Sequence, residues 1–593
     1  MSETAVTKKT SLFGLLAKLM PLAFQYERGY FLMNNMLSIL HSVSWGMSVF
    51  ARQWFFDAVT GAATGNGTIG FAVWMLVIYG FVTTAQQGLN GLSNFLIMRW
   101  FERFAARMKA LLARKAGRVN AVLFEDPKML DGVNKAQEGA ENSAMAIFTP
   151  IGLFTFYLPY FVVLTIYLYS RKPILALAIP LVFIPVAITQ FIRTKVFADL
   201  EEKLGSVRRK YEYFEKSIAD RDSFKETRLL GNYRFLRKLF TGSLADFSGL
   251  SGKAEKKTAR WELFMKLITL MGYMGILYLL FSALMADEIS IGVFASVFAE
   301  VGVMFGIMEE VICRHIGGMA KQVGTVKNFV DFLYAPERTG AAVDLSARPE
   351  IRLENAHFRY PGAEKEAVRG VNLTVRPGES LAVVGENGAG KTTLVRLLTG
   401  LYLPTEGKST VDGHDMRDVH PKSLFLHTSA AFQKYMRYRM TLQDNVQVSS
   451  PDSTEEIESS LARADLAPTD ASFPDGNDTM LSREFEGVDL SGGQWQRVAL
   501  ARGFYRGHGV IVLDEPTAAI DPLEETRVYR KFAEVSKEVT AIIVTHRIGS
   551  ARIADRIVVM NDGVIEEEGS HEELLARGGH YAEMVTAQAD WYK

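Results

Sequence analysis

The chain is poor in cysteine and carries no net charge, and both features exclude classes of protein. Its one cysteine, Cys313, rules out an internal disulfide and a metal site built from several cysteines. Because Cys313 follows an apolar run, we expect a structural thiol rather than a catalytic nucleophile. Lysine and arginine number 66, as do aspartate and glutamate, so the overall charge does not favour a nucleic-acid partner. The N-terminal residues lack a convincing small-residue cleavage site, so we predict no signal peptide.

Long apolar runs, in contrast, dominate the first half of the chain. Six of them are about as long as a bilayer-spanning helix requires, and they cover residues 30–50, 68–98, 144–169, 173–191, 264–285 and 289–311. Lysine and arginine are concentrated after the second and fourth runs, which places these connections and both termini in the cytoplasm. Apolar residues keep a helical spacing through both connections, so we expect helices that extend beyond the bilayer. The pattern predicts an α-helical, six-span transmembrane domain.

A change in composition after Tyr334 marks a domain boundary. Residues 335–348 are polar, contain proline and lack periodicity, as a linker does. Beyond them, short β-rich runs alternate with helical stretches, which predicts an α/β domain with a mainly parallel sheet. The sequence therefore divides into an amphipathic N-terminal cytoplasmic segment (1–28), a six-helix transmembrane domain with long intracellular extensions (29–334), a linker (335–348) and the α/β domain (349–593).

A glycine-rich motif gives the α/β domain its chemistry. Residues 385–392 read GENGAGKT and fit the phosphate-loop pattern between a predicted strand and a predicted helix. Glycines allow backbone N–H groups to surround a phosphate, Lys391 supplies a positive charge, and the Thr392 hydroxyl can ligate Mg²⁺. We therefore predict a P-loop nucleotide-binding domain that takes a nucleotide and Mg²⁺. Its predicted nucleotide contacts are Gly385, Glu386, Asn387, Gly388, Ala389, Gly390, Lys391, Thr392 and Thr393.

An acid pair at the end of a second apolar strand complements this loop. The stretch GVIVLDEP places Asp514 and Glu515 at the carboxyl edge of the predicted sheet, where ligands of α/β folds bind. Asp514 is predicted to hold Mg²⁺ through water. Glu515 is predicted to be the general base that polarises the attacking water.

Residues 490–494, between these two motifs, read LSGGQ, and on this signature the chain resembles the ATP-binding cassette (ABC) transporters. The resemblance implies that Tyr360 is an aromatic residue that stacks on adenine. It also implies two further catalytic residues: Gln433, which would also ligate the metal, and His546, the switch histidine. It also implies nucleotide contacts from the signature and from the AAID stretch, namely Ser491, Gly492, Gly493, Gln494 and Asp521.

Six spans followed by one cassette resemble an exporter half-transporter. In this family the signature of one cassette closes on the nucleotide of another, so the resemblance implies a homodimer, with a degenerate partner chain as the alternative. Two turn-prone cytoplasmic stretches, residues 124–130 and 225–232, resemble the coupling helices of exporters, although solvated loop helices would read similarly.

The cassette loops also carry a resemblance that concerns cargo. Phe432 precedes Gln433 where many exporters have proline, and REFEG replaces a GERG-like stretch before the signature. Both departures resemble bacterial lantibiotic and bacteriocin peptide exporters. The resemblance implies ATP-driven export of a peptide or amphipathic substrate across the bacterial cytoplasmic membrane by alternating access, with membrane lipids as the surroundings. A lipid or multidrug exporter, or an importer built on the exporter fold, remains an alternative.

The sixth apolar run contains an acid, Glu300. It lies 11 residues after Ile289, where we expect this span to begin at the outer surface. At about 1.5 Å per residue it is about 16 Å deep, near the middle of a core about 30 Å thick. An acid there must be paired, hydrated or protonated, so Glu300 and His41, at similar depth in the first span, are candidate substrate-cavity contacts. A structural Glu300–His41 pair is the alternative, and Glu310 is predicted to pair with Arg314.

Overall fold

The structure, a computed structural model, describes residues 12–220, 223–311, 315, 317–515, 531–534 and 539–590. The chain divides into two compact units. The helical unit comprises Met1–Lys115 and Gly132–Tyr334, and the cassette unit comprises Ala116–Asp131 and Ala335–Lys593. A short piece of the predicted transmembrane domain, residues 116–131, thus clusters with the cassette.

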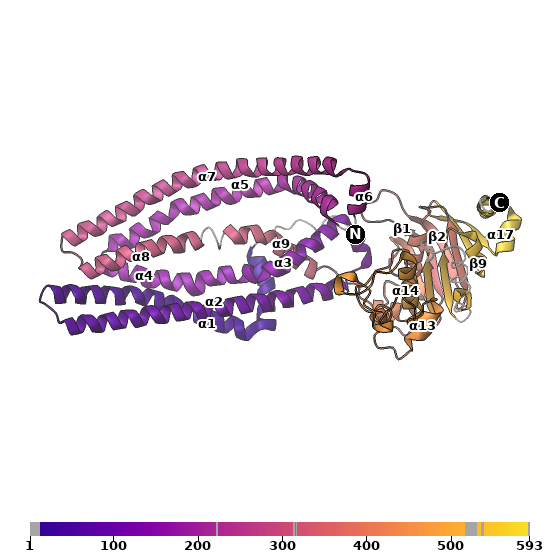
Figure 1. Ribbon diagram of the computed structural model, residues 1–593, viewed down its shortest axis with the longest axis horizontal. Helices are drawn as coiled ribbons and strands as arrows, with labels where there is room; N and C mark the ends of the chain where they lie inside the picture. Colours follow the sequence, from indigo (N-terminus) through magenta and orange to yellow (C-terminus); the bar gives the residue numbers. More distant parts are fainter. Residues whose placement is uncertain are drawn as a thin grey trace. The chain divides into compact units, whose positions relative to one another are not determined.

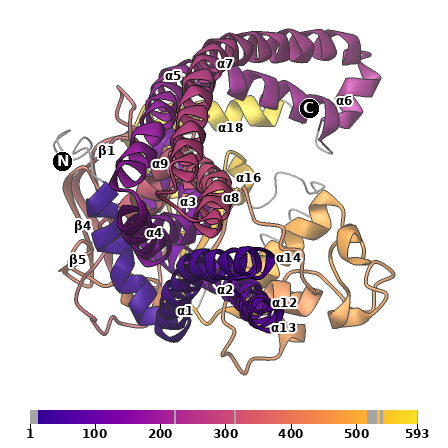
Figure 2. The ribbon, with the colours of Figure 1, turned by 90° about the vertical axis from the view of Figure 1, so that its left-hand side faces the viewer.

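The helical unit consists of long helices (Figures 1 and 2). Its elements are α1 (Leu12–Ala63), α2 (Ile69–Ala116), α3 (Pro127–Gly152), the π-helical turn η3 (Leu153–Tyr157), α4 (Leu158–Arg171), α5 (Pro173–Ala219), α6 (Phe224–Leu229), α7 (Tyr233–Met285), α8 (Ile291–Glu309) and α9 (Gly317–Leu333). The four longest helices have 47 to 53 residues, so each is about 70 to 80 Å long, against a bilayer core of about 30 Å. They are therefore long enough to extend well beyond a bilayer.

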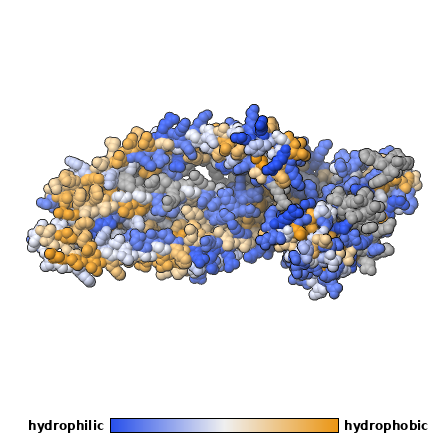
Figure 3. All heavy atoms as spheres, viewed as in Figure 1, coloured by the Kyte–Doolittle hydropathy of each residue, from blue (hydrophilic) through white to orange (hydrophobic). Residues whose placement is uncertain are grey.

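Three helical stretches are long and apolar enough to cross a membrane among the described residues: Ile69–Ala116, Gly132–Arg171 and Tyr233–Met285. The predicted count of six spans therefore stays a prediction. Large apolar side chains on α2 and α7, such as Trp74, Phe81 and Met271, are exposed in the single chain. Figure 3 shows apolar side chains gathered at the end of the bundle where α1 joins α2 and α7 joins α8. Such a surface is suited to lipid.

The helical unit packs around aromatic and branched side chains. Tyr160 and Tyr167 of α4 are fully buried in a cluster with Leu280 of α7 and Val297 of α8. Helix α1 contains one break, at Glu27, whose backbone leaves the helical region (φ −139°, ψ 36°). The buried Glu27 carboxylate accepts a hydrogen bond from Arg103 of α2 at 3.0 Å. The break lies beside the predicted end of the N-terminal segment.

The cassette unit contains two sheets. An antiparallel sheet has the order β2-β1-β4-β5, and a six-stranded sheet has the order β10-β9-β3-β8-β7-β6, in which all neighbours pair in parallel except β10 with β9. The strands are β1 (Ile351–Phe358), β2 (Val368–Val375), β3 (Ser380–Gly385), β4 (Glu406–Val411), β5 (His414–Asp415), β6 (Thr428–Ala431), β7 (Val510–Asp514), β8 (Thr540–Val544), β9 (Arg556–Asn561) and β10 (Val564–Gly569).

Helices cover the six-stranded sheet, so β3, β7 and β8 are buried along their whole length. This burial explains their nearly continuous apolar sequences, which are typical of parallel strands covered on both faces. The elements around the strands are η2 (Ala121–Glu125), α10 (Lys391–Leu398), α11 (Pro421–Leu426), α12 (Leu442–Gln447), α13 (Ile457–Arg463), η5 (Gly476–Asp478), η6 (Arg483–Phe485), α14 (Gly492–Tyr505), α16 (Ile548–Ala551), α17 (His571–Arg577) and α18 (His580–Asp590). The predicted α/β domain with a mainly parallel sheet is therefore confirmed.

Candidate functional site

Four neighbouring parallel strands end at one edge of the sheet, and each carries a predicted site residue beyond its end. Strand β3 leads into the phosphate loop, β6 is followed by Gln433, β7 ends in Asp514, and β8 is followed by His546. The register places Asp514 of β7 opposite Val544 of β8. Parallel strand order alone therefore gathers residues as far apart in the sequence as Gly385 and His546 at the edge where ligands of such sheets bind.

The phosphate loop needs its glycines for two physical reasons. Gly385, Gly388 and Gly390 have φ values of +146°, +86° and +100°, which other residues rarely adopt. A β-carbon on Gly385 would lie 2.2 Å from the carbonyl oxygen of Met560, so a larger residue would also clash. Helix α10 begins directly after the loop, and its first N–H groups lack intrahelical partners. The loop thus presents donors suited to an anion.

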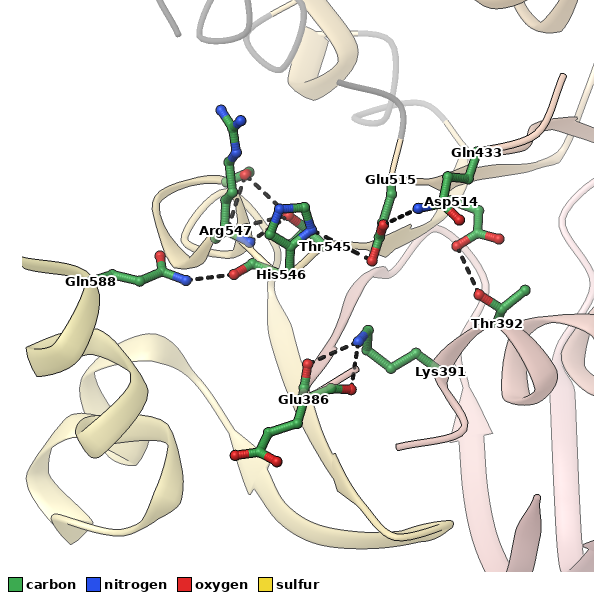
Figure 4. A network of polar contacts seen from close by, with 12 residues as sticks. Glu386, Lys391, Thr392, Gln433, Asp514, Glu515, Thr545, His546, Arg547 and Gln588 are labelled. Carbon is green, nitrogen blue, oxygen red and sulfur yellow. Dashed lines mark hydrogen bonds and ion pairs between the residues drawn. The ribbon is translucent and has the colours of Figure 1, made fainter. Parts of the chain in front are cut away.

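Lys391 occupies the centre of this loop. Its Nζ donates hydrogen bonds to the carbonyl oxygens of Gly385 and Glu386, at 2.8 and 2.9 Å (Figure 4). Burial lowers the pKa of the ammonium, an effect that Glu515 and Asp514 oppose. A buried cation that is hydrogen-bonded to neutral carbonyls is well placed to pair with a phosphate, which would also compensate its desolvation.

The acid pair splits into two differently held carboxylates. Asp514 is 3% exposed and accepts a hydrogen bond from Thr392 Oγ1 at 3.3 Å. Burial raises the pKa of Asp514, and the hydrogen bond from Thr392 opposes the rise. Glu515 has a left-handed backbone, with φ of +47°, which is rare for a residue with a side chain. Such strain often accompanies a functional position.

The side chain of Glu515 brings two more predicted residues together. It accepts a hydrogen bond from Gln433 Nε2 at 2.5 Å on one oxygen, and His546 Nδ1 lies 3.5 Å from the other. Figure 4 shows the three side chains converging from separate strand ends. The side chain of His546 is 47% exposed, whereas that of Glu515 is 13% exposed. The group therefore borders solvent on the side of the histidine.

The predicted adenine-stacking residue, Tyr360, is held through its hydroxyl. The oxygen lies 2.9 Å from Thr393 Oγ1 of α10 and accepts a hydrogen bond from Arg396 at 3.2 Å. Arg396 also donates to Glu125 at 3.0 Å, and the same carboxylate accepts a hydrogen bond from Tyr402. Burial raises the pKa of the Tyr402 hydroxyl, and the bond to Glu125 adds to the rise.

Sequence reasoning missed this network, although one signal was available. Glu125 ends the 3₁₀ helix η2 and lies inside the stretch 124–130, which we predicted as a coupling segment. Its partners Arg396 and Tyr402 belong to the cassette itself, and no motif marked them. The structure therefore connects a predicted coupling segment to the predicted adenine site within one compact unit.

The signature forms the start of a helix in another part of the cassette. Ser491 caps α14, and its side chain and that of Gln494 complete a reciprocal capping box. Tyr435, two residues after Gln433, donates a hydrogen bond to the carbonyl oxygen of Gly492 at 3.0 Å. Across the described residues, no hydrogen bond or ion pair joins residues 490–494 to the phosphate loop. Asp521 lies outside the described residues.

The structure does not pair Glu300 with His41, which was the alternative to a role of both residues in a substrate cavity, and the cavity role stays a prediction. Glu300 is 3% exposed, and its carboxylate accepts hydrogen bonds from Tyr160 at 2.5 Å and Arg52 at 3.3 Å. His41 is buried instead against Phe156, at a centroid distance of 5.0 Å. Helix α1 continues to Ala63, 11 residues past Arg52, and α8 begins 9 residues before Glu300. The first predicted span ended at residue 50, so Arg52 lay outside it and was not considered as a partner of Glu300.

Two other predictions concern the end of this region. Arg314, the predicted partner of Glu310, lies outside the described residues, as does Cys313. Glu310 has His315 within 3.9 Å. The second predicted coupling stretch overlaps the short helix α6, whose last residue, Leu229, is 87% exposed and is followed by Leu230, which is 69% exposed.

Comparisons with known proteins show what the chain is similar to. Residues 368–518 match the protein family described as ABC transporter. The chain is 25% identical to the subtilin transport ATP-binding protein of Bacillus subtilis over 96% of its length and 93% of that protein. It is 36% identical to the nisin transport ATP-binding protein of Lactococcus lactis over 40% of its own length and 40% of that protein. It is 33% identical to the ATP-dependent lipid A-core flippase of Vibrio vulnificus over 53% of its own length and 54% of that protein.

A solved structure shares the fold over almost the whole chain. The structure of a bacterial Atm1-family ABC exporter with ATP bound superposes with a TM-score of 0.78, covering 95% of this chain and 98% of that one at 20% identity. At this identity the likeness establishes the fold. A helical unit followed by an ATP-binding cassette is thus a known arrangement.

Proposed function

We propose that this chain, an ABC transporter that joins a membrane unit to a cytoplasmic ATPase cassette, exports a peptide of the lantibiotic class across the bacterial cytoplasmic membrane. The observation that supports a peptide substrate is the similarity to the subtilin transport protein, because this similarity spans nearly the full length of both chains. The nisin transport protein adds a second relative of the same kind. The cassette supplies the energy, and the helical unit supplies the path.

The hydrolysis site is proposed to work through the residues gathered at the sheet edge. ATP binds with its phosphates on the loop, where Lys391 exchanges its two carbonyl partners for phosphate oxygens. Tyr360 stacks on the adenine, and its hydroxyl contacts fix the orientation of the ring. Gln433 and His546 hold the Glu515 carboxylate from its two sides. Glu515 then accepts a proton from the attacking water as that water approaches the terminal phosphate.

The residues near Thr392 fit a magnesium ion. A threonine hydroxyl, a buried carboxylate in Asp514 and the side-chain amide of Gln433 offer the oxygen ligands that this hard cation prefers. When bound there with ATP, Mg²⁺ neutralises charge on the phosphates. The raised pKa of Asp514 fits such a site, because a buried carboxylate is stabilised in its charged form by a nearby cation.

The signature is proposed to act on the nucleotide of a second copy. Within one cassette, residues 490–494 and the phosphate loop lie on different elements, and no hydrogen bond or ion pair joins them in the described part of the chain. A helix start capped by Ser491 offers N–H groups to an anion. Because one chain carries both a phosphate loop and a signature, two copies provide two complete sites, so we propose a homodimer.

ATP binding is proposed to reach the membrane unit through η2. Glu125 there bonds Arg396, which bonds Tyr360. A nucleotide that moves Tyr360 therefore changes the contacts of the segment that precedes α3. Closure of two cassettes would then switch the helices between inward-open and outward-open states by differential affinity.

The test is ATPase activity of the purified protein in lipid nanodiscs with three classes of added compound. We expect cationic lantibiotic-like peptides to raise turnover. The flippase similarity over about half of this chain favours a second candidate, a lipid exporter. Stimulation by lipid A or by hydrophobic amines, with no response to peptides, would overturn the proposed peptide substrate and leave the proposed ATPase activity standing. Glu515→Gln, run beside the parent, identifies the turnover that belongs to this site.

A further inference from the structure

The C-terminal helix α18 reaches the turn that carries His546. The side chain of Gln588 donates a hydrogen bond from Nε2 to the carbonyl oxygen of His546 at 2.5 Å. Its Oε1 accepts a hydrogen bond from the backbone N–H of Ile548 at 2.9 Å. Figure 4 shows Gln588 approaching this turn from a helix of its own. One amide thus bonds the backbone on both sides of Arg547.

The two contacts require a glutamine amide in one orientation. The carbonyl of His546 needs a donor and the N–H of Ile548 needs an acceptor, and an amide supplies one of each. A carboxylate of the same shape would supply an acceptor to both and leave the carbonyl facing a negative charge. The chemistry of the turn therefore selects glutamine over glutamate at this position.

Two side chains within the turn bond its middle residue, Arg547. Thr545 Oγ1 accepts a hydrogen bond from the N–H of Arg547 at 3.0 Å, and Ser550 Oγ donates to the carbonyl oxygen of Arg547 at 3.0 Å. Gln588 completes this set at the residues on either side. The imidazole of His546 is 47% exposed and lies 3.5 Å from Glu515. A shift of the backbone that carries this ring would therefore move it relative to Glu515.

Helix α18 is anchored well enough to act as a support. Tyr581 is fully buried in a cluster that includes Ala382 of β3 and Ile548. Its hydroxyl lies 2.8 Å from His571 Nδ1. The N–H of His580 donates to Glu567 at 2.6 Å, which fixes the start of the helix. Gln588 lies seven residues beyond Tyr581, or about 10 Å along the helix axis.

We propose that Gln588 is a positioning residue for hydrolysis: it clamps the backbone of residues 546–548 so that His546 stays in reach of Glu515. The inference rests on the proposed role of His546 and adds a part of the chain that no motif marks. A displacement of about 1 Å at a catalytic group can lower a rate by about a hundredfold. Loss of two backbone contacts, with the helix still in place, is expected to cost about tenfold.

The experiment measures single-turnover ATP hydrolysis and ATP affinity of the full-length protein in nanodiscs. Gln588→Ala is expected to lower the hydrolysis rate about tenfold with ATP affinity and melting temperature unchanged. Gln588→Glu, which keeps the shape of the side chain, is expected to lower the hydrolysis rate at least as much. Thr586→Ala is the matched control, because the Thr586 hydroxyl donates a hydrogen bond to the carbonyl oxygen of Ala582 within the same helix, and the parent rate is expected.

A double variant separates positioning from general damage. In a His546→Ala background, Gln588→Ala is expected to have no further effect, because the group that it positions is already gone. A parent-like rate in Gln588→Ala, or losses that multiply in the double variant, would overturn the clamp. If His546→Ala alone kept the parent rate, the proposed hydrolysis site would fail instead, so the two failures can be told apart.

Discussion

Two glutamates, one in each unit, show how different partners give one side chain different roles. Glu300 of the helical unit is 3% exposed, and its carboxylate faces a cation, Arg52, and the hydroxyl of Tyr160. Glu515 of the cassette unit has a neutral amide and an imidazole beside it. A charge matched by an opposite charge is stable and unreactive, whereas a carboxylate held by Gln433 and His546 keeps the ability to accept a proton.

Backbone geometry separates the two residues further. Glu300 lies inside the regular helix α8, where neighbouring turns hold it. Glu515 has a left-handed backbone directly after a buried strand, and its N–H donates to the carbonyl oxygen of Val544 at 3.0 Å. Rigid strands thus position a strained residue, as expected for a reactive group. The comparison predicts that changing Glu515 affects chemistry and changing Glu300 affects stability.

The largest effect is expected for Glu515→Gln. The amide cannot accept the proton of the attacking water, so turnover should fall by about a thousandfold. ATP affinity should persist, because the phosphate loop is untouched. Binding of a fluorescent ATP analogue and phosphate release measure the two quantities. Glu572→Gln, an exposed residue in the first turn of α17, serves as the control. Sustained hydrolysis in Glu515→Gln would remove this residue from the role of base.

Lys391→Ala should lose nucleotide affinity by about a hundredfold or more. The variant removes the buried ammonium that bonds the loop carbonyls of Gly385 and Glu386, and with it a charge-assisted contact to phosphate worth about 3 kcal/mol. Equilibrium titration with the same ATP analogue measures the loss. Unchanged affinity would contradict the assignment of the phosphate loop.

Glu300→Gln should lower stability rather than turnover. The change leaves Arg52 buried without a full countercharge, which costs about 3 kcal/mol when one partner of a buried pair is removed. Arg52→Leu combined with Glu300→Leu should recover much of this loss. Thermal unfolding in nanodiscs, followed by intrinsic fluorescence, compares the three proteins. A stable Glu300→Gln variant that no longer responds to peptide would make Glu300 a cargo contact after all.

Tyr402→Phe should have the smallest effect. It removes the hydrogen bond from Tyr402 to Glu125 and the one that Tyr402 accepts from Arg396, and it leaves the bond from Arg396 to Glu125. The cost is about 2 kcal/mol. Basal ATP hydrolysis should stay within about twofold, while stimulation by transported peptide should weaken, because η2 is held less firmly. Steady-state ATPase rates with and without peptide measure both. An unaltered response to peptide would argue against coupling through Glu125.

The cassette was easier to predict from sequence than the helical unit because strand order determines its site. Gln433, Asp514 and His546 lie at or just beyond the ends of neighbouring parallel strands, so the sheet must bring them together. The network of Glu125, Arg396 and Tyr402 could not be predicted in the same way, because it depends on how a distant segment packs.

The helical unit shows where sequence reasoning stops. Depth along a helix was counted from the edges of apolar runs, and this count placed Glu300 opposite His41. The structure instead pairs Glu300 with Arg52, which lies beyond the predicted end of the first span. A long charged side chain can lie inside a helical bundle when an oppositely charged side chain is there to pair with it. A span that is delimited by hydropathy alone therefore stops too early at such a residue. Which side chains meet between two helices depends on how the helices pack, and hydropathy along the sequence does not give that packing.

The most direct test of the central claim is ATP-dependent uptake of a lantibiotic-like peptide into inside-out vesicles that contain this protein. The account predicts that peptide accumulates with ATP and that Glu515→Gln vesicles accumulate none while they still bind ATP. Peptide uptake that is equal in parent and Glu515→Gln vesicles, or absent from the parent while ATP is hydrolysed, would contradict it.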